Sequence, residues 1–541
     1  MTSFAGAPTD EEVERFNVCL LEMIVEGMLP FDVVENRGLR NLIEHLGPRY
    51  TLPTRKTVEC TLIPGLYENI MSEVAELISN AKHVAVTIDI WTYTNSDPYV
   101  TATAHFIDTN IRYRPLVLST KKLIANYTAK YLSEVLLEIF QWWNIEKKIS
   151  VIIADPKAVI KSAIQLLGIE SIPCTGHSLN NVINNSLKLD VNENDPLANV
   201  NSYQVQIINL VKLCRSIAKY FKFNQIPRRL LREKLKELNY TVLKLKLDDS
   251  SKWNSTLVMM ERFLKIKKPL TSLSLLILRC PQMPTTEQWT IMEDLVMLLK
   301  PFEMMTMQLT EDHRPTLGII IPLIRGLLLS LENRTPKTSS GTFLKETLIC
   351  NVMKVFGSFE LMQPSSYYAK ATILDPRFKK AAFTSSSQSD NVELNIVYEV
   401  NDLLKIKKEC DTATIDIVTT SQQTTDFTNS TENLLDYLQD KVTTIWSKSN
   451  CTNTTAVTLI KQYMDLTYLN LLEDPIQFWK THNSLLGPLS DVALKYACIP
   501  ALSVSSEIMF SRAGKVEIQR KNKLSPKDID TMIFLNKNIG K

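Results

Sequence analysis

The chain has 541 residues, a formal net charge of +3 and 45 % hydrophobic residues, an ordinary composition for a folded protein. This length exceeds what one hydrophobic core supports and predicts several domains, or one domain with a large insertion. Only 14 glycines are present, which argues against glycine-rich phosphate loops. Nine cysteines without any C-x-x-C pair are typical of reduced thiols in the cytosol or nucleus, and they argue against a disulfide framework.

Neither a secretory signal nor a membrane span is expected. Asp10 and Glu12 lie where a signal peptide requires a basic start. The longest apolar stretch, residues 317–331, is short and contains Pro322 and Arg325, so it does not suit a bilayer crossing.

The first predicted elements change from helices to strands. Residues 10–80 have apolar residues at helical spacing, interrupted by prolines, and predict several short helices. Alternation of period two then predicts three consecutive strands, followed by a helix and a buried strand, in the order βββαβ. These five elements span residues 83–91, 99–107, 113–118, 129–143 and 149–155.

The rest of the chain is predicted to be mainly helical. The helical spacing covers residues 159–167, 205–220, 230–238, 256–263, 287–300 and 317–331. Residues 411–455 are rich in Thr, Ser, Asn and Gln and predict a mobile linker with one helical island at residues 434–446. Two more helices are expected around residues 489–496 and 504–512.

Charge is distributed unevenly along the chain. Residues 212–270 contain 16 Lys and Arg against 5 Asp and Glu, and residues 512–541 contain 8 against 3. Within the first stretch, Arg228, Arg229 and Arg232 are the candidate phosphate contacts. Basic runs on helices are commonly solvated faces, but a stretch this lopsided in a nearly neutral chain also suits a polyanion such as DNA. The pattern indicates the charge of a partner and no particular sequence.

Two aspartates occupy positions suited to metal chemistry. Asp89 lies in or at the end of the first predicted strand, and Asp155 lies at the end of the fourth. If these strands are parallel neighbours, both carboxylates emerge at one edge of the sheet, where they can hold two divalent ions for chemistry at a phosphate. Carboxylate ligands suit Mg²⁺ or Mn²⁺ better than zinc. The alternative is that each aspartate only caps a turn or a helix.

Seven segments, spread in order over most of the chain, carry a family resemblance. They are LPFDVVENRGLRNLIEHLGPRYTLPTRKTV (residues 29–58), TIDIWT (87–92), CTGHSLN (174–180), KWNST (252–256), LKPFEMMTMQLTEDHRPTLGIIIPLI (299–324), ATILDPRFK (371–379) and WKTHNSLLGPLSDVALKYACIPALSVSSEIMFSRAGKVEIQRKNKLSPKDIDTMIFLNKN (479–538). In number, order and spacing they resemble the hAT-superfamily DNA transposases, most of all the branch that includes the zinc-finger BED-domain proteins of animals.

The resemblance implies a fold and a metal site. The fold would be an α/β ribonuclease H-like core interrupted by a long all-helical insertion, with a C-terminal helical dimerisation region. The positions that match the family's metal ligands are Asp89, Asp155 and Glu507. Without the family, Glu507 would be taken as a first-turn glutamate that favours its helix N-terminus. The expected boundaries are a helical region over residues 1–80, core over 81–165, insertion and basic segment over 166–410, linker over 411–455, and the C-terminal part over 456–541.

The resemblance also implies DNA-facing residues in the insertion. Cys174 and His177 match a C-x-x-H motif near the active site, and no second ligand pair with zinc spacing accompanies them. Trp253 matches an aromatic residue that stacks on an extruded base, although an ordinary core tryptophan fits the pattern equally well. Lys252 stands where the family has arginine, so it keeps the charge and loses bidentate contact with phosphate.

Three departures weaken the enzymatic interpretation. No zinc-binding BED finger is found among the nine cysteines and six histidines. Asp155 is followed by Pro156 and, four residues on, by Val159, where the family usually has asparagines; proline lacks the backbone N–H, and valine lacks the amide. Ile508 replaces an arginine that often follows the catalytic glutamate.

Two functions follow as hypotheses. The first is a nuclear, transposase-derived protein that binds DNA, forms homodimers or larger oligomers, and retains or has lost Mg²⁺- or Mn²⁺-dependent DNA cleavage and strand transfer. The second is a domesticated, non-enzymatic regulator of transcription or chromatin that keeps only the fold and dimerisation. The intact acidic triad favours the first, whereas the missing finger and the altered surroundings of Asp155 favour the second.

Overall fold

The computed structural model describes residues 9–46, 50–92, 97–187, 201–248, 253–274, 276–277, 280–310, 316–361, 366–419, 452–503 and 525–540. The chain divides into two compact units. Unit 1 contains Met1–Cys174 and Ala497–Lys541, and unit 2 is formed by Thr175–Glu311 and Thr316–Tyr496. Unit 2 is therefore inserted, along the chain, between two parts of unit 1.

Unit 1 combines one sheet with surrounding helices. Its described elements are α1 (Asp10–Glu26), a 3₁₀ turn (Phe31–Glu35), α2 (Arg37–Leu46), α3 (Arg55–Thr57), a π-turn (Val58–Leu62), α4 (Ile63–Ser79), β1 (Val84–Thr92), β2 (Pro98–Ile107), β3 (Tyr113–Lys122), α5 (Ala129–Trp142), β4 (Ile149–Ala154), α6 (Ala158–Leu166), β5 (Ser171–Pro173) and α22 (Pro526–Asn538). The predicted order βββαβ is confirmed. The first and fourth helices are longer than the short helices expected there, at 17 residues each.

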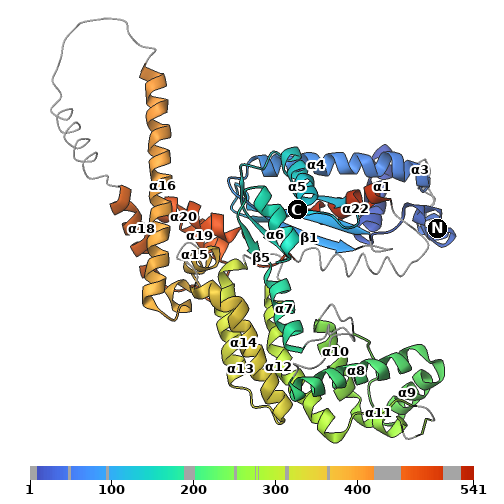
Figure 1. Ribbon diagram of the computed structural model, residues 1–541. Helices are drawn as coiled ribbons and strands as arrows, with labels where there is room; N and C mark the ends of the chain where they lie inside the picture. The colour runs from blue at the N-terminus through green and yellow to red at the C-terminus, as the bar shows by residue number, and fades with distance from the viewer. Residues whose placement is uncertain are drawn as a thin grey trace, which may run out of the picture. The chain divides into compact units, whose positions relative to one another are not determined.

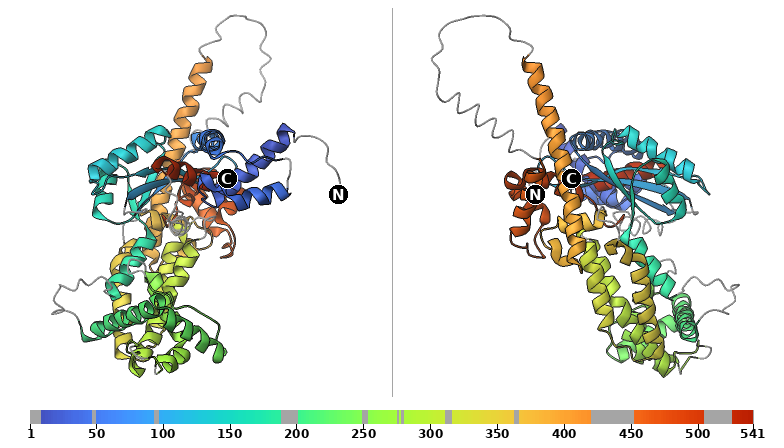
Figure 2. Two further views of the ribbon diagram at one scale, coloured as in Figure 1. Left: turned by 90° about the vertical axis from the view of Figure 1, so that its right-hand side faces the viewer. Right: turned by 60° about the vertical axis from the view of Figure 1, so that its left-hand side comes forward.

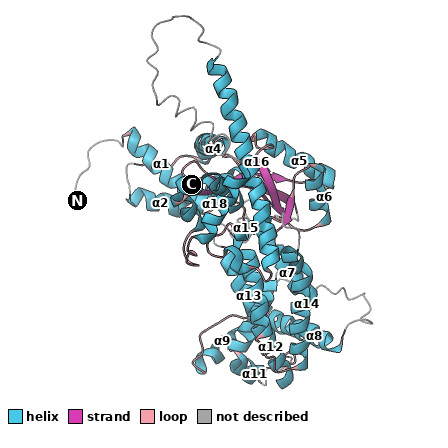
Figure 3. Ribbon diagram, turned by 90° about the vertical axis from the view of Figure 1, so that its left-hand side faces the viewer, coloured by secondary structure: helices cyan, strands magenta, loops and turns pink. Residues whose placement is uncertain are grey.

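The five strands form a mixed sheet in the order β3-β2-β1-β4-β5. β2 pairs antiparallel with β1 and β3, whereas β1 and β4 are parallel neighbours. The central strand β1 is almost entirely buried, as expected for a strand covered on both faces. All the strands of the described chain belong to this one sheet, part of which is visible in magenta behind the helices in Figure 3.

Helices from both ends of the chain meet on the sheet. Figure 1 shows α4, α5 and α22 running alongside it. The ring of Phe534 on α22 lies 4.9 Å from that of Tyr67 on α4 and 6.2 Å from that of Trp143, which follows α5. These rings belong to one large apolar cluster, whose burial stabilises unit 1.

The edge strand β3 is covered by polar side chains of α22. Asn538 accepts a hydrogen bond from the backbone N–H of Val117 at 3.0 Å and donates one to its carbonyl oxygen at 2.8 Å. Asp530 accepts another from the N–H of Thr120 at 2.6 Å. These contacts satisfy backbone groups that an exposed edge would leave open to pairing with other chains.

Unit 2 is helical throughout its described residues. Its helices are α7 (Thr175–Leu187), α8 (Ser202–Phe223), α9 (Gln225–Glu237), α10 (Trp253–Lys265), α11 (Lys267–Ser274), α12 (Thr286–Leu309), α13 (Ile320–Glu332), α14 (Ser339–Leu361), α15 (Tyr367–Ile373), α16 (Ser386–Thr419), α18 (Thr452–Asp465), α19 (Pro475–Thr481) and α20 (Asn483–Ala497), with 3₁₀ turns at Leu317–Ile319 and Lys379–Ala382. Figure 2 shows α16 as a long helix whose far end extends beyond its neighbours in unit 2.

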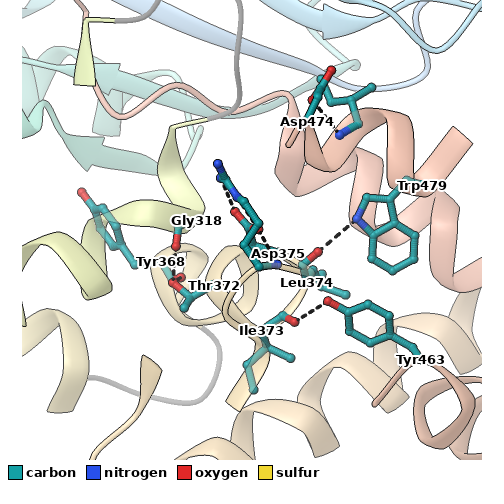
Figure 4. Close-up of polar contacts among 11 residues, drawn as sticks. Gly318, Tyr368, Thr372, Ile373, Leu374, Asp375, Tyr463, Asp474 and Trp479 are labelled. Atoms are coloured by element: carbon teal, nitrogen blue, oxygen red, sulfur yellow. Dashed lines mark hydrogen bonds and ion pairs between the residues drawn. The ribbon is translucent and has the colours of Figure 1, made fainter. Parts of the chain in front are cut away.

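The C-terminal end of α15 holds helices α18 and α19 in place. The hydroxyl of Tyr463 on α18 donates to the carbonyl of Ile373 at 2.9 Å, and the indole N–H of Trp479 on α19 donates to that of Leu374 at 3.0 Å (Figure 4). Both aromatic side chains are buried. Each therefore contributes apolar burial and a satisfied polar group at the same contact.

Most helical expectations for unit 2 are confirmed, with one correction. Residues 411–419, expected to belong to a mobile linker, continue α16 to Thr419. The remainder of that linker up to residue 451, with its island at 434–446, and the helix expected at 504–512 lie outside the described residues. Within the residues that the structure does describe, no helix is long and apolar enough to span a membrane.

Candidate carboxylate pair and nucleic-acid interface

The sheet brings Asp89 and Asp155 together. Ile88 of β1 is the register partner of Ala154, the last residue of β4, so Asp89 in β1 and Asp155 directly after β4 follow this pair. Register partners on parallel strands point to the same face, and both carboxylates therefore lie on one face at the same edge. Asp89 is 7 % exposed, and the side chain of Asp155 is 10 % exposed. The parallel pairing of β1 with β4 is as expected from the sequence, and a metal site at these two residues stays a prediction.

The face that carries Asp89 is polar, and its side chains are linked by hydrogen bonds. Its antiparallel partner is Thr101, whose hydroxyl accepts a hydrogen bond from the indole N–H of Trp91 at 3.0 Å and is bonded to the hydroxyl of Thr120 at 3.1 Å. The Trp91 ring stacks on Tyr99 with centroids 5.1 Å apart. This network fixes side chains on the strands beside Asp89.

Lys157 is a cation next to the pair, and nothing in the sequence pattern singles it out. Its ammonium group lies 2.9 Å from Asp155 Oδ2. Partial burial acts to lower the pKa of Lys157, but the hydrogen bond and charge of Asp155, with smaller contributions that include the charge of Asp89, raise it above its ordinary value. Both carboxylates therefore act on one lysine. In the sequence it resembles any exposed lysine at the start of a helix.

Cys174 contacts both the end of strand β4 and the chain segment that leads to Glu507. Its N–H donates to the carbonyl of Ala154 at 2.8 Å, directly before Asp155. Its thiol lies 3.3 Å from both the backbone nitrogen and the hydroxyl of Ser503. The described chain therefore reaches the strand edge at Ser503, shortly before Glu507. Cys174 has no exposed surface, so its contacts are within the chain, whereas His177 is half-buried in the first turn of α7.

The donor atoms of the pair suit a divalent ion. Two carboxylates on one face are the oxygen ligands that Mg²⁺ and Mn²⁺ prefer, and in this respect Asp89 and Asp155 fit. Glu507 lies outside the described residues. Among the residues that are described, no group of three or more His, Cys, Asp or Glu side chains could hold a metal ion. The third ligand thus stays a prediction.

A basic groove lies in unit 2 beside α9. Leu231 and Leu235 on the inner face of this helix are buried, and Arg228, Arg229 and Arg232 are exposed. A surface hollow of about 640 Å³ continues from Arg228 along the chain segment that follows α9. The cations that line the groove are Lys222, Arg228, Arg229, Arg232, Lys244, Lys246 and Arg262.

The groove carries little compensating negative charge. Its described lining contains no Asp or Glu, and Arg229 makes only an exposed 3.6 Å pair with Glu233. Asp248, which ends the segment with Lys244 and Lys246, is turned inward and paired bidentately with Arg215, with distances from 2.8 to 3.0 Å. Thr256 of α10 also donates to Asp248, at 2.8 Å. Pairing of this acid holds the segment in place and leaves the groove cationic.

Trp253 lies inside unit 2. It is 5 % exposed at the start of α10, and its ring meets that of Phe302 edge-on with centroids 6.4 Å apart. Its backbone N–H donates to Asn180 at 3.4 Å. In this structure the ring is part of the helical core, which is the alternative interpretation of the residue. Lys252 lies outside the described residues.

Three family models match the chain. The ZBED1 RNase-like domain matches residues 87–171, the ZBED1 RNase-like helical domain matches 172–298, and the hAT family C-terminal dimerisation region matches 459–539. The first ends within β5 and the second begins just before α7, close to the boundary between the units. The dimerisation region is shared between them: α18, α19 and α20 lie in unit 2 and α22 in unit 1.

Whole-chain relatives are distant. Zinc finger BED domain-containing protein 4 of Homo sapiens is 24 % identical over 97 % of this chain and 44 % of its own length. Putative transcriptional regulator tpeD of Talaromyces stipitatus is 24 % identical over 95 % of this chain and 61 % of its own. Putative AC transposase of Zea mays is 21 % identical over 93 % and 62 %. The chain spans about half the length of the curated relatives that it matches.

Proposed function

Because the chain carries a hAT dimerisation region and both ZBED1 RNase-like domains, we propose that it is a transposase-derived protein that binds DNA and self-associates. The basic groove beside α9 is the observation that supports DNA binding most strongly. Seven cations line one surface whose described lining holds no carboxylate, an arrangement that suits a phosphate backbone. From this DNA-bound role we infer a nuclear location.

The direct test is DNA affinity as a function of salt. We expect the purified chain to bind a short duplex of mixed sequence, with an affinity that falls steeply as salt rises. The triple variant Arg228→Ala, Arg232→Ala and Lys244→Ala should bind about tenfold more weakly or worse, and its salt slope should fall by about one for each phosphate that is no longer neutralised. Fluorescence anisotropy measures both quantities.

Lys354→Ala is the matched control, because Lys354 is exposed on α14 and does not line the groove. It should bind as the wild type does. Equal salt slopes for the triple variant and the wild type would show that DNA, if bound, lies elsewhere.

Metal-dependent strand cleavage is the second candidate function, and the shared face of Asp89 and Asp155 favours it. These residues, with Glu507 as the family's third ligand, would hold Mg²⁺ or Mn²⁺, and the ion would supply charge for activation of a water or a 3′-hydroxyl and for stabilisation of the leaving oxygen. Release of nicked product from supercoiled DNA with Mn²⁺, and its loss in Asp89→Asn, would support it.

A non-enzymatic regulator is the alternative, and Lys157 favours it. An ammonium group within 2.9 Å of Asp155 supplies positive charge where a metal ion would bind. DNA binding and self-association with no Mn²⁺-dependent nicking would support this function. Both alternatives share the groove and the dimerisation region.

A further inference from the structure

Three large apolar side chains in the dimerisation region lie exposed on one loop. Residues 466–473, called the apolar loop below, join α18 to α19. Tyr468, Leu471 and Leu472 expose 56 %, 62 % and 80 % of their surface. Single exposed apolar residues are common on proteins, but three within five positions form a patch that needs a physical reason.

The apolar loop is held firmly at its start. The ammonium group of Lys379 donates to the carbonyl oxygens of Tyr463 and Leu466 at 2.7 and 2.6 Å, where the loop leaves α18. Lys379 is 1 % exposed and lies 5.2 Å from the ring centroid of Tyr468. A buried cation that satisfies helix-end carbonyls fixes the direction in which the chain continues.

The middle and end of the loop are held as well. The backbone N–H of Leu469 donates to the carbonyl of Pro376 at 3.0 Å. Asn470 turns the chain by accepting from the N–H of Leu472 at 3.0 Å. Asp474, drawn in Figure 4 near Trp479, then caps α19 by accepting from the N–H of Ile476 at 2.9 Å. The leucines are thus presented to water by an ordered backbone.

Such a loop suits an interface. Its backbone is already bonded in the free protein, so contact with a partner costs little further conformational entropy. Burial of the leucines then adds directly to affinity. Because residues 459–539 match a dimerisation region, a second copy of this chain is the partner that the observations favour.

We propose that Leu471 and Leu472 of the apolar loop form the self-association contact of this protein. The inference rests on the proposed self-association and assigns it to particular residues. In a two-fold dimer the same patch contributes from both copies, so each substitution acts twice.

Sedimentation velocity on the full chain over a wide concentration range tests the proposal. The wild type should dimerise, and Leu471→Asp/Leu472→Asp should weaken dimerisation about a hundredfold or more, since each buried leucine contributes roughly tenfold. The matched control is Leu166→Asp/Leu329→Asp, because these leucines are 63 % and 58 % exposed on α6 and α13, outside the dimerisation region. The control should dimerise as the wild type does.

The possible failures are distinguishable. A loop variant that dimerises with the wild-type dissociation constant overturns this assignment and leaves self-association standing. A wild type that stays monomeric throughout overturns both. A fluorophore attached at Leu472→Cys gives a second readout: its emission should shift to shorter wavelength as the dimer forms, and an unchanged spectrum would count against the contact.

Discussion

Single residues decide the electrostatics of the carboxylate pair. Asp89 and Asp155 are brought to one face by strand register, and Lys157 adds a positive charge beside them. The sequence allowed their placement in the sheet to be predicted, because Asp89 lies in β1 and Asp155 directly follows β4. It could not indicate Lys157, because a lysine at a helix start is usually solvated and only the fold turns it toward a carboxylate.

Lys157→Gln should raise the affinity of the pair for Mn²⁺. The amide removes a positive charge about one ion-pair distance from the metal position, where charge repulsion is worth about 1 kcal/mol, or roughly fivefold in affinity. Isothermal titration calorimetry measures the change. Lys161→Gln, at an exposed position on the adjoining helix α6, should leave the affinity unchanged. Equal Mn²⁺ affinities for Lys157→Gln and the wild type would show that the charge of Lys157 does not oppose metal binding by the two aspartates.

Glu399 on α16 is the shared partner of a charged cluster in unit 2. Its carboxylate pairs with Lys370 and Lys495 and accepts a hydrogen bond from the hydroxyl of Tyr496 at 2.6 Å. Burial acts to raise the pKa of Glu399, but the charges of Lys495 and Lys370 outweigh burial and lower it. The cluster therefore stabilises the fold above the unfolded-chain pKa of this acid, and the contribution is lost as pH falls through the lowered pKa.

Glu399→Gln should destabilise unit 2 by about 3 kcal/mol near neutral pH, because Lys370 keeps its charge in a buried position without a counter-charge. The deficit should shrink as pH falls, since acid also neutralises Glu399 in the wild type. Thermal unfolding from about pH 7 to about pH 3 measures this dependence. Glu346→Gln, at an exposed position on α14, serves as the control. If Glu399→Gln and the wild type differed in stability by the same amount at all pH values, the proposed role of the Glu399 charge would be wrong.

At the scale of elements, the strands were predictable and their partners were not. The alternation of period two located β1 and β2 to about one residue at each end, because these strands have covered faces, whereas it located the start of β3 and ended that strand about four residues too early. The short strand β5, Ser171–Pro173, shows no pattern in three residues and was missed. The packing of α22 on β3 was also missed, since pairing between distant segments leaves no local signature.

Asn538→Ala should destabilise unit 1 by about 2 kcal/mol. The substitution leaves the N–H and C=O of Val117 buried without their present partners. It also uncovers part of an edge strand, so the variant should aggregate faster when heated. Differential scanning calorimetry and light scattering give the two readouts. Lys527→Ala, exposed at the start of the same helix, should behave as the wild type; similar losses in both variants would assign the effect to α22 as a whole.

At the scale of the whole molecule, the family and the fold were predictable, since seven segments in a fixed order identify both. Those predictions are confirmed. The division of the dimerisation region was not foreseen, because a boundary within residues 456–541 has no composition signature. In the sequence, the basic groove was indicated only by the excess of Lys and Arg over Asp and Glu. Its shape depends on the inward pairing of Asp248 with Arg215, which are far apart in the sequence.

Unit 1 should fold without unit 2. The contact of Cys174 with Ser503 shows that the chain returns to the point where it left unit 1. Deletion of residues 175–496, with a short Gly-Ser linker in their place, should therefore give a folded protein with a cooperative thermal transition. The same deletion without residues 525–540 should fail to fold, because α22 completes the core. Circular dichroism distinguishes the outcomes, and two unfolded products would contradict the prediction.

The bond between Val117 and Asn538 joins residues that are 421 positions apart in the sequence. A ribosome that adds about 5–20 residues per second needs roughly 20 to 80 seconds to make the intervening chain. During that time β3 has left the ribosome while α22 does not yet exist, so the nascent protein carries an uncovered sheet edge. Correct folding of this protein should therefore depend strongly on chaperones that bind the nascent chain and on the rate of translation. A protein whose sheet is completed by neighbouring segments of the chain should depend on them less.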